Sequence, residues 1–313
     1  MRDVQHRLLA LGFAAGDDEA GEYGPGTVAA IRAFQDRRGL RIDGVCGDDT
    51  WSALVEAGYR LGDRHLSLTA PFLRGDDVAE LQRRLGSLGF DPGRVDGIFG
   101  KSTDRALVDF QRNVGLVTDA ICGPSTLAAL GRLGASGSTP SVTTVRERER
   151  HFRRPHSLAG RSIAIGDTGG LDAVASLIAA ALTEAGGKVL LLQHPDGSEQ
   201  AAQANAVEVD AYLGLSLADG PNGCSTAYYR AASGWESPEG RRLAELVQTG
   251  LVPVLHGRDA GVRGMAVPVL RETRMPAVVA ELGAAGVVVE RAADVATALT
   301  AALRRWVAPA ADA

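Results

Sequence analysis

Leu85-Gly86-Ser87-Leu88-Gly89-Phe90 repeats the pattern of Leu8-Leu9-Ala10-Leu11-Gly12-Phe13, at an offset of 77 residues from Phe13 to Phe90. Further matches continue at an offset of 76 residues: Phe34-Gln35 with Phe110-Gln111, Cys46-Gly47 with Cys122-Gly123, and Leu54 with Leu130. Self-similarity at a fixed period indicates a repeated structural unit. We therefore predict two copies of one small domain, at residues 1–60 and 74–133.

Each unit is predicted to be a bundle of three helices. In the second unit, Val78, Leu81 and Leu85 recur at spacings of three and four residues, which places them on one apolar helix face. Two glycine-containing turns, at 96–100 and 119–124, separate this helix from a second and a third.

The pattern changes after residue 157, where short apolar runs alternate with amphipathic stretches. Strands are predicted at 162–165, 188–192 and 211–217, and helices at 171–185, 199–209, 238–250 and 294–306. This alternation is typical of an α/β domain, at 158–307, with a mixed or largely parallel sheet flanked by helices. The fold class expected for the chain is thus α + α/β. Residues 134–157, rich in Gly, Ser and Thr and then in alternating Arg and Glu, are expected to be a flexible linker.

Composition limits the classes of function. The chain has 313 residues, 45% hydrophobic and 23% charged, with a net charge of -5, which is typical of a globular protein and argues against a nucleic-acid partner. No apolar run resembles a secretory signal or a membrane span, and three cysteines favour a reducing compartment. We expect a cytoplasmic protein, associated with a membrane only through partners. The alternative is export, directed by an upstream signal outside this sequence.

The repeated units resemble the peptidoglycan-binding domain family. The resemblance rests on an Asp-Gly-x-x-Gly-x-x-Thr turn and a Phe-Gln pair, which the second unit supplies as Asp96, Gly97, Gly100, Thr103, Phe110 and Gln111. The first unit supplies Asp43, Gly44, Gly47, Thr50, Phe34 and Gln35. Two departures stand out: Gly21-Glu22 takes the place of the first Asp-Gly of unit one, and Ala120 replaces a glycine in unit two.

This resemblance implies binding of a peptidoglycan fragment or a lipid-linked precursor. The candidate ligand-binding residues are Asp96, Gly97, Thr103 and Gln111 in unit two and Asp43, Gly44, Thr50 and Gln35 in unit one. The alternative is that these residues only build turns. Because unit two has an intact first turn, we expect it to bind more tightly. Cys46 and Cys122, at equivalent positions, are predicted to be small buried residues rather than metal ligands.

Residues 160–307 carry a second resemblance, to the zinc-dependent N-acetylmuramoyl-L-alanine amidases. Its landmarks are residues 163–170, Ala204-Asn205-Ala206, residues 212–216, Ala227-Tyr228-Tyr229 and, most specific, residues 270–283. The resemblance implies a zinc ion held by two histidines and a glutamate, with an open position for the attacking water. It also implies that Glu281 stands at the position of the catalytic carboxylate.

The zinc ligands that the resemblance implies are missing from the sequence. Thr168 lies in the motif that should carry the first histidine, Ser216 stands at the second, and the segment that should bring the glutamate is deleted before Leu171. A substitute site using His194 and His256 is the remaining alternative, since both follow or precede predicted elements of the α/β domain. We therefore expect no metal and no other cofactor.

Three hypotheses of function follow. The first, which we favour, is a non-catalytic regulator of cell-wall synthesis that binds peptidoglycan or its precursor, and so is not an enzyme, with a cell-wall synthesis protein as a further partner. This combination of modules resembles that of actinobacterial cell-wall regulators, and the resemblance implies the first hypothesis. The second is an active amidase that uses zinc to cleave the amide between muramic acid and the stem peptide. The third is a wall anchor with a vestigial domain.

Overall fold

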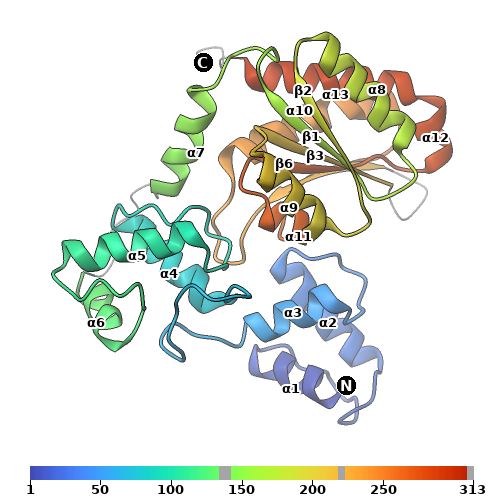
Figure 1. Cartoon of the computed structure of the whole chain (residues 1–313). Coiled ribbons are helices and arrows are strands. Elements are labelled where there is room, and N and C mark those ends of the chain that lie inside the picture. The colour runs from blue at the N-terminus through green and yellow to red at the C-terminus, as the bar shows by residue number, and fades with distance from the viewer. Residues whose placement is uncertain (134–141, 218–222, 309–313) are drawn as a thin grey trace. The chain divides into compact units, whose positions relative to one another are not determined.

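The computed structural model describes residues 1–133, 142–217 and 223–308 (Figure 1). By its internal contacts the chain divides into two compact units, one of residues 1–146 with 231–235 and the other of residues 147–230 with 236–313. The first unit contains both repeats and the second contains the sheet.

The first repeat is a three-helix bundle, as predicted. Its helices are α1 (Arg2–Ala10), α2 (Pro25–Arg38) and α3 (Asp48–Glu56). Leu8, Ile31 and Leu54 are fully buried, and the ring of Phe34 meets Phe13 edge to face at 5.6 Å between centroids. One apolar face from each helix therefore closes a small core.

The second repeat has the same architecture. It consists of α4 (Asp76–Ser87), α5 (Lys101–Asn113) and α6 (Pro124–Arg132), with Phe90 and Phe110 edge to face at 5.5 Å. Cys122 is fully buried and Cys46 half-buried, and both pack against their core clusters as small apolar residues. Helix α5 begins after Gly100 and α6 with Pro124 at its first turn, a position that tolerates proline.

The expected linker is partly helical, which corrects the prediction of an unstructured segment at 134–157. Residues 134–141 lie outside the described residues, but α7 (Val142–Phe152) is a helix. Its order has a physical cause that composition does not reveal. His151 is 5% exposed and packs against the buried ring of Trp306, about 155 residues away in sequence, at 4.3 Å between centroids.

The α/β unit is built on a six-stranded sheet in the order β2-β1-β3-β6-β4-β5. The strands are β1 (Ser162–Asp167), β2 (Lys188–Gln193), β3 (Ala211–Ser216), β4 (Cys224–Tyr229), β5 (Asp259–Met265) and β6 (Ala277–Glu281). Strands β2, β1, β3 and β6 are parallel, while β4 runs antiparallel to β6 and parallel to β5. The sheet is thus mixed, as expected.

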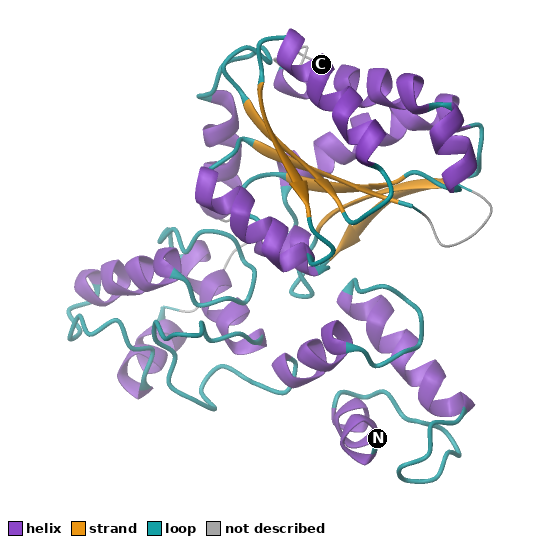
Figure 2. Ribbon diagram, turned by 45° about the vertical axis from the view of Figure 1, so that its right-hand side comes forward, coloured by secondary structure: helices purple, strands orange, loops and turns teal. Residues whose placement is uncertain are grey.

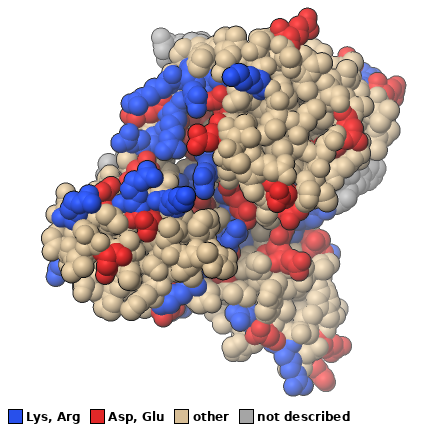
Figure 3. Space-filling model, viewed as in Figure 1, with Lys and Arg blue, Asp and Glu red and all other residues tan. Residues whose placement is uncertain are grey.

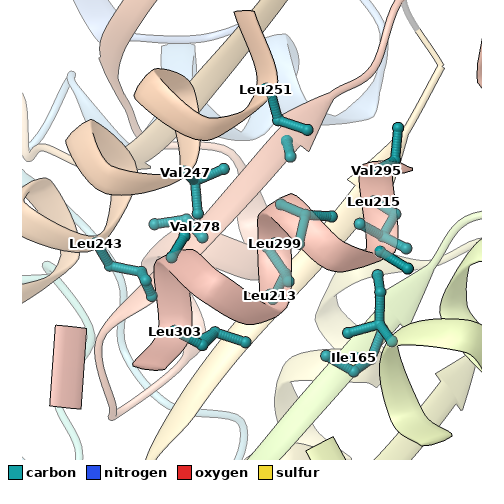
Figure 4. Close-up of a cluster of buried hydrophobic side chains, with 14 of the residues drawn as sticks. Ile165, Leu213, Leu215, Leu243, Val247, Leu251, Val278, Val295, Leu299 and Leu303 are labelled. Atoms are coloured by element: carbon teal, nitrogen blue, oxygen red, sulfur yellow. The ribbon is translucent and has the colours of Figure 1, made fainter. Parts of the chain in front are cut away.

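Helices cover both faces of this sheet (Figure 2). One face packs against α8 (Asp172–Glu184), α10 (Pro238–Leu255) and α13 (Ala292–Val307), and the other against α9 (Gly197–Val207) and α11 (Pro268–Glu272). The short α12 (Ala285–Glu290) joins β6 to α13. Figure 4 shows the core between the sheet and the first group, where Leu213, Val278 and Leu299 are fully buried.

Three of the six strands were predicted and three were not. The expected strands at 162–165, 188–192 and 211–217 correspond to β1, β2 and β3, and the four expected helices correspond to α8, α9, α10 and α13. Helix α10 continues five residues beyond the predicted end, to Leu255. Strands β4 and β5 escaped prediction because their sequences contain no continuous apolar run, and β6 because its run is too short to distinguish a strand from a helix.

Candidate functional site

A buried glutamine braces the first turn of the second repeat. The side-chain amide nitrogen of Gln82 donates to Asp96 Oδ1 at 2.8 Å, to the Ile98 carbonyl at 3.0 Å and to Thr103 Oγ1 at 3.1 Å. Its oxygen accepts from the backbone nitrogens of Asp96 and Gly97. Because Gln82 and Thr103 are each 1% exposed, this network replaces water for several buried polar groups.

The second turn repeats the arrangement with Gln111. Its amide nitrogen donates to Asp119 Oδ1 at 2.8 Å, to the Ile121 carbonyl at 3.0 Å and to Thr126 Oγ1 at 3.1 Å. The backbone nitrogen of Ala120 donates back to the Gln111 oxygen at 3.0 Å. Ala120 adopts a φ of 58°, the left-handed conformation that glycine favours. This conformation explains why the family pattern has a glycine at this position.

The first repeat has the same two hydrogen-bond networks, each centred on a glutamine; we call each network a glutamine bracket. Gln35 donates to Asp43 Oδ1 at 2.7 Å and to Thr50 Oγ1 at 3.0 Å, and it accepts from the backbone nitrogen of Gly44. Gln5 donates to Thr27 Oγ1 at 3.1 Å and accepts from the backbone nitrogen of Gly21 at 2.6 Å.

These hydrogen bonds correct the alignment of the two repeats. The sequence comparison set Gly21-Glu22 against the first Asp-Gly of unit two. In the structure Gly21 donates to Gln5 as Gly97 donates to Gln82, so Ala20-Gly21 is the equivalent pair. The first repeat therefore retains the turn glycine, with Ala20 in place of Asp96, and Asp18 accepts from the backbone nitrogens of Gly26 and Thr27 instead.

The structure divides the candidate ligand-binding residues between two turns in unit two. Asp96, Gly97 and Thr103 gather around Gln82, whereas Gln111 belongs to the second turn. In unit one, Asp43, Gly44 and Thr50 all surround Gln35. Sequence reasoning missed Gln82 and Gln5, although their equivalence at the 77-residue offset was a usable signal.

The turn carboxylates are held ionised by their surroundings. The backbone N–H of Val45, and then the amide of Gln35, lower the pKa of Asp43, partly opposed by burial. The backbone N–H of Ile121, followed by Gln111, lowers the pKa of Asp119 in the same way. Each of these turns presents a fixed negative charge beside short polar groups.

A second candidate site lies at the carboxyl ends of the parallel strands, which we call the sheet edge below, as distinct from the outer strands β2 and β5. Strands β1, β3 and β6 end at Asp167, Ser216 and Glu281, and Ser216 pairs with Glu281 in the register of β3 and β6. Because β4 runs the other way, its first residues lie at the same edge, and Ser225 pairs with Glu281. The residues of the second resemblance are thus brought together.

Glu281 is engaged in an ion pair. Its Oε2 lies 2.7 Å from Nη2 of Arg263 on β5 and accepts from Ser225 Oγ on β4 at 2.5 Å. Arg263 Nη2 also donates to Ser225 Oγ at 2.7 Å. The Glu281 side chain is 27% exposed and that of Arg263 is 48% exposed, so the pair lies at the rim of the domain.

The remaining side chains at this edge are a carboxylate that accepts hydrogen bonds from the backbone, and hydroxyls. Asp167, 2% exposed, accepts from the backbone nitrogens of Gly169 at 2.8 Å and Leu171 at 3.1 Å, which orders the entry to α8. Thr168 and Ser216 add only hydroxyl oxygens. Zinc in proteins prefers thiolate, imidazole and carboxylate ligands. One carboxylate already paired with a guanidinium, together with hydroxyls, does not fit a zinc ion.

The topology also tests a substitute site made from the two histidines. His194 follows β2, whereas His256 caps the end of α10 just before β5. Strands β2 and β5 are the two opposite edges of the six-stranded sheet, separated by five interstrand spacings or about 24 Å. Among the described residues no group of three or more His, Cys, Asp or Glu side chains could hold a metal ion.

Comparison with known proteins places both parts of the chain. The peptidoglycan binding domain family matches residues 1–54 and 74–130, and the N-acetylmuramoyl-L-alanine amidase family matches residues 170–294. The N-acetylmuramoyl-L-alanine amidase CwlM of Mycobacterium tuberculosis is 39% identical over 286 residues, covering 81% of this chain and 70% of that protein. The chain belongs to the CwlM family of amidase-like cell-wall proteins.

More distant relatives match one part of the chain. The N-acetylmuramoyl-L-alanine amidase CwlL of Bacillus licheniformis is 31% identical over 154 residues, covering 42% of this chain and 43% of that protein. The crystal structure of an N-acetylmuramoyl-L-alanine amidase from Clostridium difficile 630 aligns with a TM-score of 0.40 and 18% identity, covering 46% of this chain and 96% of that one. In the described ranges, no helix is long and apolar enough to cross a membrane.

Proposed function

We propose that this chain is a non-catalytic regulator of cell-wall synthesis that binds peptidoglycan or a precursor and holds no zinc. The observation that carries the proposal is the ion pair between Arg263 and Glu281, at the strand end where the amidase resemblance puts the catalytic carboxylate. The guanidinium of Arg263 pairs with the Glu281 carboxylate, which in an amidase would face the metal-bound water.

Charge explains why such an edge does not activate water. A metal lowers the pKa of its bound water to about 7, far below the value in bulk solution. Without that shift a carboxylate alone leaves almost no hydroxide at neutral pH, and Glu281 is further held by two donors. The alternative, amide hydrolysis, draws support from the family match and from Glu281 itself, and it requires ligands that this edge does not supply.

The helical modules supply the binding part of the proposal. Stem peptides and amino sugars carry amides, hydroxyls and carboxylates, which suit a surface of turn backbone and short polar side chains. The proposed contacts are the turns around Asp96, Gly97 and Thr103, around Gln111, and around Gln35 with Asp43, Gly44 and Thr50. Unit two is proposed to bind more tightly because its first turn carries Asp96, whereas Ala20 stands at that position in unit one.

The proposal places the chain in the cytoplasm, where it would meet lipid-linked precursors and the proteins that make or export them. Its three cysteines support this placement, because all are free and Cys122 and Cys224 are buried. Burial raises the pKa of the Cys122 thiol to about 12, so this residue stays an unreactive thiol.

The experiment that tests the proposal follows binding and turnover in one sample. The full chain is titrated with a soluble muropeptide by calorimetry, and the same mixture is then analysed by mass spectrometry. We expect saturable binding with the muramic acid to peptide amide intact. Release of free stem peptide in proportion to enzyme and time would support the amidase instead, and absence of binding would contradict the regulatory role.

A further inference from the structure

The outward face of α7 is basic and carries an exposed aromatic ring. His151 is 5% exposed and packs against Trp306, whereas its neighbour Phe152 is 48% exposed, although the Phe152 ring meets the His151 ring edge to face at 5.7 Å between centroids. Arg150 and Arg153 lie next to Phe152 and are exposed as well. An exposed phenylalanine surrounded by arginines does not contribute to the core of the domain. Such a combination of apolar and basic side chains is typical of an interaction surface.

Buried contacts hold this face in a fixed position on the α/β unit. His151 Nε2 lies 3.2 Å from the Trp306 carbonyl oxygen, and the guanidinium of Arg161, 1% exposed, donates to the carbonyls of His151 and Pro155. Glu147 accepts from Ser237 Oγ at 2.5 Å and from the backbone nitrogen of Glu239 at 3.1 Å. The face is therefore part of a packed domain and not a loose tail.

The same contacts bring a second group of arginines beside α7. Trp306 lies in the last turn of α13, so Arg304 and Arg305, both exposed, are close in sequence to the residue on which His151 packs. Arg242 ties this end together by donating to the carbonyls of Trp306 and Ala308. We call the exposed set Arg150, Phe152, Arg153, Arg304 and Arg305 the basic face.

Two acids of α7, Glu147 and Glu149, lie beside the basic face. Glu149 pairs with Arg153 at 3.6 Å, but both side chains are largely exposed, and Glu147 is occupied at the start of α10. Figure 3 shows Lys and Arg side chains gathered over α7 on a chain whose net charge is -5. A concentrated positive patch on an acidic protein is an asymmetry that attracts an anionic partner.

We propose that the basic face binds an anionic lipid membrane directly, with Phe152 entering the headgroup region and the arginines contacting lipid phosphates. Arginines near a negatively charged membrane surface each strengthen binding about fivefold, and an interfacial aromatic ring adds apolar contact that a purely ionic partner would not use. This inference goes beyond the proposed function and does not depend on it, because neither the helical modules nor the sheet edge takes part.

The test is sedimentation of the full chain with vesicles of defined composition. Vesicles of phosphatidylcholine with 30% phosphatidylglycerol, on the order of the anionic content of bacterial membranes, are compared with pure phosphatidylcholine at low and at physiological salt. We expect binding to the anionic vesicles only, weakened by salt. Arg153→Gln with Arg305→Gln should weaken it about 30-fold, and Phe152→Ala severalfold at low salt and at physiological salt alike.

Arg258→Gln with Arg291→Gln is the control, since it removes the same charge outside the basic face, from the exposed Arg258 and from the partly exposed Arg291, which lies 4.0 Å from Asp294. The control pair should bind within about twofold of the parent chain, and circular dichroism melts should show that all variants are folded. Equal binding to neutral vesicles, equal losses in both double variants, or no binding at low salt would overturn the proposal. So would an unchanged affinity of Phe152→Ala together with equally tight binding of an oligonucleotide, which would indicate a general polyanion site.

Discussion

Arg263 Nη2 lies 2.7 Å from Glu281 Oε2 across two strand spacings, with Ser225 Oγ between them on β4. The three side chains come from the neighbouring strands β6, β4 and β5: Ser225 pairs with Glu281, whereas Arg263 pairs with Ala227 and its side chain reaches Ser225 and Glu281. A positive charge built into the protein thus faces the carboxylate. This relationship gives the sheet edge a stable, closed set of partners instead of an open coordination position.

The ion pair should contribute modestly to stability. Because both side chains are partly exposed, a double-mutant cycle with Arg263→Gln and Glu281→Gln is expected to give a coupling free energy of about 0.5–1 kcal/mol. Urea unfolding of the four proteins measures it. A coupling near zero would mean that the two groups do not hold each other in solution.

The glutamine brackets should contribute strongly to stability, although glutamine carries no charge. Gln82→Ala is expected to destabilise the second repeat by about 2–4 kcal/mol, because it strands several buried donors and acceptors at once. Gln203→Ala, which removes an exposed glutamine from α9, serves as control and should change stability by less than about 0.5 kcal/mol. Equal melting temperatures for both variants would contradict the bracket.

Asp96 and Asp43 form a matched pair for testing ligand binding. Each accepts from a buried glutamine and from the backbone nitrogen two residues later, so Asp96→Ala and Asp43→Ala should cost similar stability, about 1–2 kcal/mol. If the second repeat is the tighter binding unit, Asp96→Ala should weaken muropeptide binding by about tenfold, and Asp43→Ala, in the weaker unit, should weaken it less. Titration calorimetry with melts alongside separates the effects. If the affinity losses merely follow the stability losses, these aspartates stabilise the turns and do not contact the ligand.

The His151 cluster predicts a loss of stability in acid. Burial, together with Arg161 and Arg242, lowers the pKa of His151 to about 4 from an ordinary value of 6.5. The unfolded chain therefore binds this proton first, so the stabilisation is complete above about pH 6.5 and falls by roughly 3 kcal/mol as the pH approaches 4. Burial raises the pKa of Glu239, 3.7 Å from the ring, which offsets part of this loss.

His151→Gln isolates the contribution of the ring. Urea unfolding at pH 7, 5.5 and 4.5 should show a steeper loss of stability in the parent chain than in the variant, while the Glu239 contribution stays common to both. Parallel pH profiles would show that His151 is solvated and titrates normally.

The repeats and the first half of the sheet were predictable because their signals are local. Leu8 and Leu85 mark equivalent helix faces, and β1 is a short apolar run before two glycines. Strand β6 was not recognised, since a run as short as Ala277-Val278-Val279-Ala280 does not distinguish a strand from a buried helix. Glu281 was identified through the family resemblance, whereas Arg263 was not, because its partnership depends on strand order. The order of α7 likewise depends on Trp306, far along the chain.

The most direct test of the account is the zinc content of the full chain, purified without chelator, then incubated with excess zinc and desalted. Inductively coupled plasma mass spectrometry gives zinc per chain, and a parallel incubation with muropeptide gives turnover. We predict well under one zinc per chain before and after incubation, with no release of stem peptide. One zinc per chain that survives desalting, together with release of free stem peptide, would contradict the account.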